Sequence, residues 1–173
     1  MTHPGLPEWD MPLPVPDNIE IGEGSQIWSA WAFAHYRSTR PCGLRMGRNS
    51  ALWNMSMLDL GPDGELTVGD FSTLLDVTVA TNGSVRVGDY SMIGHQVVLA
   101  GGPAPVPPEP DAPAAGRPEP IEIGSGCWVT AGSIILPGAR IGDDAIVGAG
   151  AVIDGDVPPG ATAYGNPYRV RLR

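Results

Sequence analysis

The chain of 173 residues has no lysine, because all ten of its basic residues are arginine. Lysine chemistry, such as a Schiff base or an ammonium ligand for phosphate, is therefore excluded. Charged residues make up 17% of the chain, and acids outnumber bases by 19 to 10, which gives a net charge of −9. Nucleic acid is disfavoured as a partner, because its binding needs cations that neutralise phosphates.

Long apolar runs and paired cysteines are also missing. No stretch of eighteen apolar residues occurs, and the first twenty residues hold nothing typical of a signal peptide. The two cysteines, Cys42 and Cys127, make no disulfide framework. The sequence therefore predicts a cytoplasmic protein that binds no membrane, and 42% hydrophobic content in a chain of this length predicts one globular domain.

A repeat of six residues is present instead. From Ile123 the chain reads IGSGCW VTAGSI ILPGAR IGDDAI VGAGAV IDGDVP, with Ile or Val first and a small residue usually fifth. The 24 glycines and 19 prolines argue against helices, and turn residues every six positions favour short strands. The same register extends backwards in groups of three hexads, with insertions after each third hexad. It predicts six triangular coils, with hexads of the third coil starting at Val68, Leu74 and Ala80.

The repeat divides the chain into three predicted parts. Residues 1–18 form a proline-rich N-terminal segment, residues 19–157 form the coils, and residues 158–173 form a capping tail. Each coil buries its apolar side chains by stacking on neighbours, so the ends need covers. The longest insertion, residues 101–120, is rich in proline and predicts a stiff extended arm. A loop of this length in a compact domain is more often functional than a linker.

Residues 121–173, which end in DVPPGATAYGNPYRVRLR, resemble the hexapeptide-repeat acyltransferases of the maltose and xenobiotic acetyltransferase group. The resemblance implies an all-β fold, the left-handed parallel β-helix. It also implies a homotrimer, with acyl-CoA in the groove between subunits. Ala131 and Ala149 then occupy the places that line the pantetheine groove, and Arg169, Arg171 and Arg173 could pair with phosphate.

Two departures from that family weigh against its usual chemistry. The family's catalytic histidine, which takes the proton from the acceptor hydroxyl, corresponds to Ala104 here. The Thr-Lys pair that contacts coenzyme A corresponds to Asp154 and Gly155, and an acid repels phosphate. Three functions therefore stay open: acyl transfer from acyl-CoA to a hydroxyl or amine of a small molecule, a lyase, isomerase or cyclase of specialised metabolism that no longer uses CoA, and a catalytically silent trimeric binding protein.

The register also predicts a replacement for the missing base. Residues at the third place of the second hexad point outward and stack at about 4.8 Å from coil to coil. Asp76 under His95 is an arrangement in which a carboxylate orients an imidazole base, and Asn54 could donate an amide hydrogen bond to substrate. The predicted catalytic residues are His95, Asp76 and Asn54, and a solvated or interface role for the same residues is the alternative. The corresponding first-hexad column is expected to be an ordinary solvated face: Glu23, Arg48, Asp70, Asp89, Ser125 and Asp143.

Four more side chains are candidates for contact with substrate. His35 and Asn82 share the third-place column of the third hexads, and Trp53 flanks the lower end of the polar column. Trp128 matches a family position beside the active-site loop. Core or interface packing is the competing interpretation of both tryptophans. No metal site is predicted, because His35 and His95 fall on different faces three coils apart.

Overall fold

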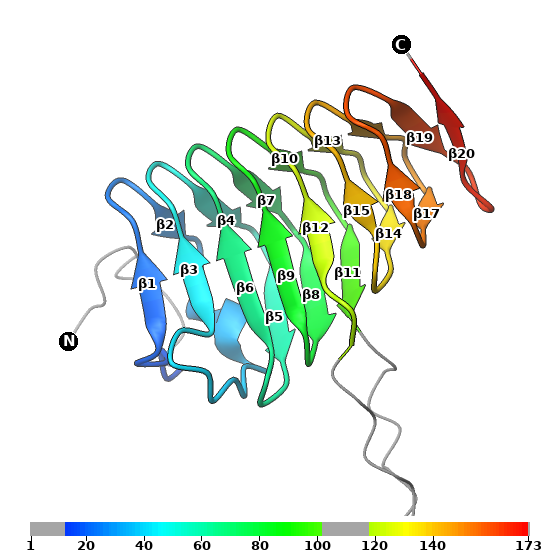
Figure 1. Ribbon diagram of the computed structural model, residues 1–173. Coiled ribbons are helices and arrows are strands. Elements are labelled where there is room, and N and C mark those ends of the chain that lie inside the picture. The colour runs from blue at the N-terminus through cyan, green and yellow to red at the C-terminus, as the bar shows by residue number, and fades with distance from the viewer. Residues whose placement is uncertain (1–12, 102–117, 173) are drawn as a thin grey trace, which may run out of the picture.

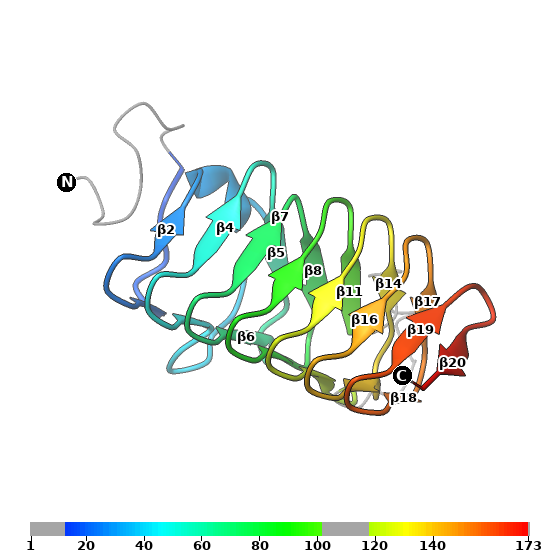
Figure 2. The same ribbon diagram turned by 90° about the horizontal axis from the view of Figure 1, so that it is seen from above.

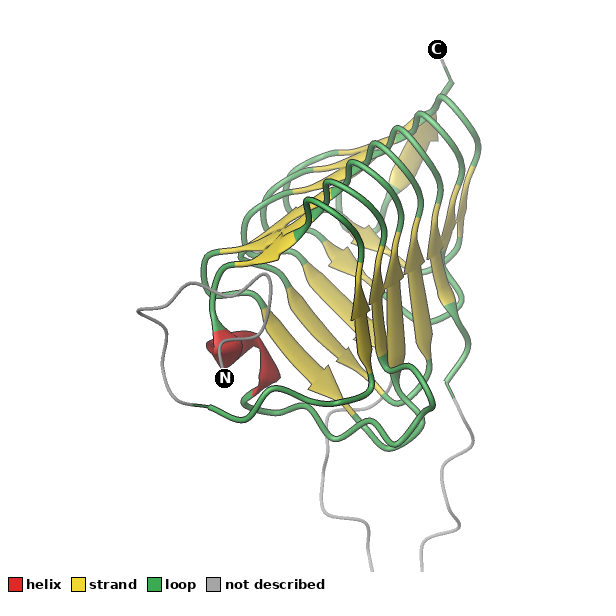
Figure 3. Ribbon diagram, turned by 90° about the vertical axis from the view of Figure 1, so that its left-hand side faces the viewer, coloured by secondary structure: helices red, strands yellow, loops and turns green. Residues whose placement is uncertain are grey.

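The computed structural model describes residues 13–101 and 118–172, which form the predicted left-handed parallel β-helix. Its coils stack from the N-terminal end to the C-terminal end (Figure 1), and the view along the stack in Figure 3 shows their triangular outline. Each side of the triangle is one parallel sheet, called here the first, second and third face in chain order. The first corner follows the first face, and the second and third corners follow their faces likewise.

Twenty strands make up the three faces within the described residues. The first face contains β1 (Ile19–Ile21), β3 (Leu44–Met46), β6 (Glu65–Val68), β9 (Ser84–Val87), β12 (Ile121–Ile123), β15 (Arg140–Ile141) and β18 (Asp156–Val157). The second contains β2 (Gln26–Ile27), β4 (Ala51–Trp53), β7 (Thr73–Leu75), β10 (Met92–Ile93), β13 (Trp128–Val129), β16 (Ile146–Val147), β19 (Thr162–Tyr164) and β20 (Arg169–Arg171). The third contains β5 (Met57–Leu60), β8 (Thr78–Thr81), β11 (Val98–Gly101), β14 (Ile134–Ile135) and β17 (Val152–Ile153).

The first coil and the tail depart from the regular coil geometry. The third side of the first coil is a 3-10 helix, η1 (Ala30–Phe33), whose N-cap Ser29 accepts a hydrogen bond from Trp31 N–H. At the other end the ladder continues through β18 and β19 (Figure 2), and β20 then pairs antiparallel with β19. The coils therefore extend to Tyr164, beyond the boundary that the hexads suggest.

The interior is a stack of aliphatic side chains that the parallel strands contribute, mostly from the first place of each hexad. Leu52, Leu74, Ile93, Val129 and Val147 lie in register along the second face, each at most 1% exposed. Burying such a side chain stabilises the fold by about 1.5–3 kcal/mol. The core is therefore continuous along the axis, as the repeat predicts.

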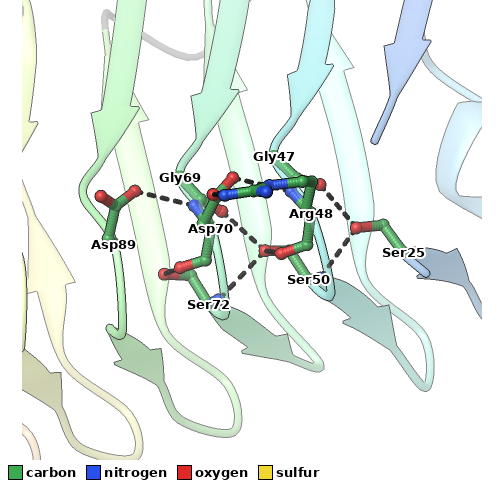
Figure 4. A network of polar contacts seen from close by, with 8 residues as sticks. All are labelled: Ser25, Gly47, Arg48, Ser50, Gly69, Asp70, Ser72 and Asp89. Carbon is green, nitrogen blue, oxygen red and sulfur yellow. Dashed lines mark hydrogen bonds and ion pairs between the residues drawn. The ribbon is translucent and has the colours of Figure 1, made fainter. Parts of the chain in front are cut away.

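A ladder of serine hydroxyls lines the inside of the first corner (Figure 4). Ser50 Oγ donates to Gly69 O at 2.6 Å and accepts from Ser72 N–H at 3.0 Å. Ser25 below it and Ser72 above it repeat the pattern. The serines at the fifth place thus do more than fit a tight space, because each hydroxyl makes hydrogen bonds to backbone groups of the coil above.

The outer column of the first corner was expected to be an ordinary solvated face, and the structure corrects this. Asp70 Oδ1 accepts from Arg48 N–H at 2.8 Å, and Asp89 Oδ1 accepts from Asp70 N–H at 2.8 Å (Figure 4). Ser125 and Asp143 continue the series. The Arg48 guanidinium also pairs with Asp70 at 2.8 Å, and these contacts lower the pKa of that carboxyl. The column is a structural ladder that ties coil to coil.

Candidate functional site

The turns of the second corner bring the predicted catalytic residues onto one edge of the solenoid. Their backbones form a continuous series: Gln96 N–H donates to Asp76 O at 2.9 Å, Gly132 N–H to His95 O at 2.9 Å, and Gly150 N–H to Ala131 O at 3.0 Å. Asp76, His95 and Ala131 therefore occupy equivalent places in successive coils, as the hexad register predicts. Only the lower end of this column departs from it.

The turn after β7 is one residue shorter than a hexad requires. Val79, not Ala80, pairs with Leu58 below and Leu99 above, and Val79 is fully buried. Val77 takes the inward place that the register gave to Thr78, since Val77 N–H donates to Ser56 Oγ at 3.1 Å. The predicted third start at Ala80 is therefore wrong by one residue.

The short turn changes the direction in which the Asp76 side chain projects from the backbone. Asp76 has a left-handed backbone conformation, with φ +54°. In the next coil that conformation is adopted by Gln96 (φ +57°) and not by His95. No side-chain hydrogen bond or ion pair between Asp76 and His95 occurs in the part of the chain that the structure describes. Orientation of the imidazole by this carboxylate stays a prediction.

Asn54 stays below Asp76, because Trp53 and Leu75, the residues just before them, are paired. Asp76 N–H donates to Trp53 O at 3.2 Å, one residue earlier than an unbroken register would give. Asn54 itself is exposed with φ +56°. Its amide thus lies at the second corner, near the foot of the column, and a role in contacting substrate stays a prediction.

Above His95 the outer surface of the second face is lined by small residues. Ala131 and Ala149 are exposed, and the neighbouring second-place residues are Gly94, Thr130 and Gly148. The opposite edge of this strip is apolar: Met92 pairs with Trp128, which is 51% exposed, and Trp128 pairs with Ile146. The strip leads from His95 towards β19 and β20.

The lower tryptophans form their own cluster. The rings of Trp28 and Trp53 lie 5.2 Å apart between centroids, tilted by 44°. Trp53 is half-buried and belongs to β4, two coils below His95. Trp128 is on the strand directly above β10, in register with Met92, three residues before His95.

The two third-corner candidates are not brought to the second corner. His35 is exposed just after η1, in the first coil. Asn82 does not align with Gly101, because Thr81 takes that place, and Asn82 Oδ1 accepts from Asp63 N–H at 2.9 Å. The predicted shared column of His35 and Asn82 is therefore wrong, and Asn82 has a structural contact. Ala104 lies outside the described residues.

Positive charge gathers where the strip ends. Arg169 and Arg171 are exposed on β20, in register with Tyr164 and Thr162, and Arg171 lines a hollow with Thr162, Tyr164 and Leu172. Asp154, directly after β17 at the third corner, is also exposed. β10 and β20 are four strand spacings apart, about 19 Å. Arg173 lies outside the described residues.

Both cysteines have packing contacts. Cys127 is 2% exposed and its Sγ donates to Gly142 O at 3.2 Å, while the half-buried Cys42 donates to Leu44 O at 3.2 Å. Burial is the main cause that raises the pKa of each thiol. Neither is a thiolate nucleophile of the kind used in catalysis.

We expect thiol labelling to follow burial. Raised pKa values reduce the thiolate fraction at pH 7, so a disulfide reagent should label Cys42 at least about tenfold slower than a free thiol. Cys127 should react only after unfolding. A Cys42→Ser variant that is still labelled in its folded state would contradict this, and the same experiment sets the background for assays that detect thiols.

No group of three or more His, Cys, Asp or Glu side chains within residues 13–101 and 118–172 is placed to hold a metal ion. None of the described helical segments is long and apolar enough to cross a membrane.

Comparisons with known proteins agree with the repeat. Residues 120–155 match the bacterial transferase hexapeptide (six repeats) model. The chain is 31% identical over 98 residues to a galactoside O-acetyltransferase of Lactococcus lactis, and 33% identical over 101 residues to that of Escherichia coli. These alignments cover 57% and 58% of this chain. The chain spans about half of the curated relatives' length, 47% and 50% respectively.

Solved structures share the fold at low identity. AntD, an N-acyltransferase from Bacillus cereus in complex with dTDP and 3-hydroxybutyryl-CoA, matches with a TM-score of 0.70 at 18% identity, over 88% of this chain and 81% of that one. A hexapeptide-repeat acetyltransferase from Vibrio cholerae complexed with acetyl coenzyme A matches with a TM-score of 0.63 at 23% identity, over 76% and 70%. At these identities the likeness shows the fold alone.

Proposed function

Since the chain is a hexapeptide-repeat protein that resembles acyltransferases in sequence and in fold, we propose that it transfers an acyl group from acyl-CoA to a hydroxyl or amine of a small molecule. The observation that carries the proposal is the second corner. It places an exposed imidazole at the foot of a strip of small residues that ends at two arginines.

The residues present fit the proposed donor. Arg169 and Arg171 would pair with its phosphates, because a guanidinium forms bidentate hydrogen bonds to phosphate. Ala131 and Ala149 would leave room for the extended arm of coenzyme A, which supplies the acyl group as a thioester when bound. His95 would take the proton from the acceptor hydroxyl or amine as the oxygen or nitrogen attacks, and would return it to the departing sulfur.

Calorimetric titration with acetyl-CoA and CoA tests the donor. We expect saturable binding, and the Arg169→Ala, Arg171→Ala double variant should bind about fivefold more weakly, equal to roughly 1 kcal/mol for an exposed charge contact. Arg86→Ala is the matched control, because Arg86 is exposed on the first face.

Absence of detectable binding at millimolar ligand would eliminate acyl transfer. In that case a ligand found on the same strip would indicate an enzyme that no longer uses CoA, and an empty strip a silent binding protein. If CoA binds, release of its thiol should be followed with galactosides and with amino sugars as acceptors, since the relatives named above act on galactosides or acylate nitrogen.

A homotrimer is the second part of the proposal, and the three faces differ in the way that it requires. The outward row of the first face is charged, with Glu20 paired to Arg45 at 2.8 Å and Glu122 near Arg140 at 3.7 Å. The outward row of the third face is mostly apolar: Met57, Thr78, Val98, Ile134 and Val152. The apolar third face, with Met92 and Trp128 on the second, suits contact with further copies of the chain, whereas the first face suits water.

Light scattering in solution tests this arrangement. Three chains of 18.1 kDa should give about 54 kDa. Ile134→Glu, which puts a charge at a position 36% exposed on the third face, should lower the mass. Thr67→Glu is the matched control, because it lies between Arg45 and Arg86 on the first face and should leave the mass unchanged. A single-chain mass for the unmodified protein at micromolar concentration would refute the trimer.

A further inference from the structure

The turns of the first corner carry two aromatic residues in an unusual backbone conformation. One residue of each turn adopts the left-handed conformation. In order along the stack these residues are Gly24, Asn49, Phe71, Tyr90, Gly126, Asp144 and Gly160. Phe71 has φ +56° and Tyr90 has φ +55°. Bulky residues are rare there because the conformation is strained, whereas Gly, Asn and Asp tolerate it. Strain of this kind often marks a functional site.

The two rings form an exposed stack. Their centroids lie 5.0 Å apart and their planes differ by 7°, while Phe71 is 44% exposed and Tyr90 67% exposed. Stacking offsets part of the backbone strain, yet it leaves most of the Tyr90 ring in water. The stack continues no further, because the next coil has Gly126 at this position.

A carboxylate lies on the far side of Gly126. A Cβ atom added to Gly126 would meet Asp144 Oδ1, so the Asp144 side chain reaches over the glycine towards the coil of Tyr90. No ion pair or side-chain hydrogen bond engages Asp144 within the described ranges 13–101 and 118–172. The Tyr90 ring and the Asp144 carboxylate thus lie on either side of Gly126, which has no side chain.

The charges around this corner favour a cation. The third- and fourth-place residues of the corner include five carboxylates and one guanidinium: Glu23, Asp70, Asp89, Asp143, Asp144 and Arg48. The guanidinium of Arg48 is already paired with Asp70, on the side of the stack away from Gly126. Negative charge near Asp143 and Asp144 therefore has no cation among the side chains of this corner.

We propose that Tyr90, Gly126 and Asp144 form a binding site for a planar cation, a guanidinium group. The guanidinium would lie against the Tyr90 ring, and its N–H groups would donate to the Asp144 carboxylate. A free guanidino compound and an arginine side chain of a partner protein share this chemistry. The site lies at the first corner, across the second face from His95, and it is independent of the proposed acyl transfer.

Titration with methylguanidine, followed by backbone amide chemical shifts, tests the site. We expect saturable shifts at residues 125–127 and 144. Gly126→Asn should weaken binding at least about fivefold, because it fills the position with a residue that tolerates positive φ. Gly24→Asn is the matched control, since its added Cβ would likewise meet the side-chain oxygen of the next turn residue, Asn49 Oδ1, without an aromatic ring below.

Two substitutions separate the ring from the carboxylate. Tyr90→Asn and Asp144→Asn should each weaken binding about fivefold. Both should fold normally, because Asn49 already adopts the same left-handed conformation in an equivalent turn of this corner. A short peptide with one arginine distinguishes the two sources of the guanidinium group. Shifts with the peptide but not with methylguanidine would indicate the side chain of a partner protein. Shifts with both probes would indicate a free guanidino compound. No saturable shift with either probe, equal binding of methylammonium, or binding unchanged in Gly126→Asn would overturn the proposal.

Discussion

His95→Ala is expected to lower turnover by about two to four orders of magnitude, the usual contribution of a general base. The imidazole is exposed, so the melting temperature should stay within the small range seen for surface substitutions. The measurement is acceptor-dependent thiol release from acetyl-CoA, with purified protein whose CoA affinity has been checked. Loss of turnover with unchanged CoA affinity would assign His95 to the chemical step.

Gln26→Ala is the matched control for this variant. Gln26 is exposed on the same face three coils below, and it should keep full activity. Asp76→Asn asks whether the carboxylate assists His95: a moderate loss together with a shifted pH profile would support assistance, whereas an unchanged pH profile would leave His95 to act alone. Full turnover of His95→Ala would remove the second corner as the catalytic site.

Gly88→Ala should destabilise the fold by about 3 kcal/mol, at the upper end of the cost of overpacking. A Cβ atom there would lie 2.6 Å from both Gly124 C and Ser125 N, which are backbone atoms that cannot turn aside. The change would also push apart the coils joined by the Asp89 and Ser125 hydrogen bond. For a chain of this size the melting temperature should fall by roughly 6–12 °C.

Gly150→Asn serves as the control for that variant. Gly150 has φ +67° and no atom within 4 Å of an added Cβ, and asparagine tolerates this conformation. Its cost should be about 1 kcal/mol or less. Equal stability of the two variants in thermal or urea unfolding would show that second-place glycines are not required by the contact between coils.

The fold was predictable because its signal repeats. Each inward place needs a large aliphatic residue, so such residues recur at every sixth position. The pattern stays detectable even where one coil is irregular. The short turn after β7 was missed because both registers offer apolar residues: the chain reads LLDVTVA from Leu74. The larger side chain of Val79 compared with Ala80 is the signal that could have found it. The helical third side of the first coil has a signal in the sequence, because Trp31 and Arg37 are too large for the fifth place of its hexads.

The candidate site was predicted less completely, for a physical reason. Register fixes which residues share a column, and it correctly placed His95 above Asp76 and below Ala131. It does not fix φ, and the left-handed conformation of Asp76 depends on the length of a single turn. The aspartate column of the first corner was misjudged similarly, because a surface carboxylate and a carboxylate bonded to a backbone N–H look alike in sequence.

The antiparallel strand β20 also determines how the stack stops. A parallel coil can in principle accept another coil on its open end, since each added strand finds the same unpaired N–H and C=O groups. On the second face β20 turns back and covers β19, and Tyr168 packs half-buried against the core with its hydroxyl 3.4 Å from Asp156 O. On this face, a reversed strand with exposed arginines thus opposes the end-to-end addition of another parallel coil, a hazard of every repeating sheet.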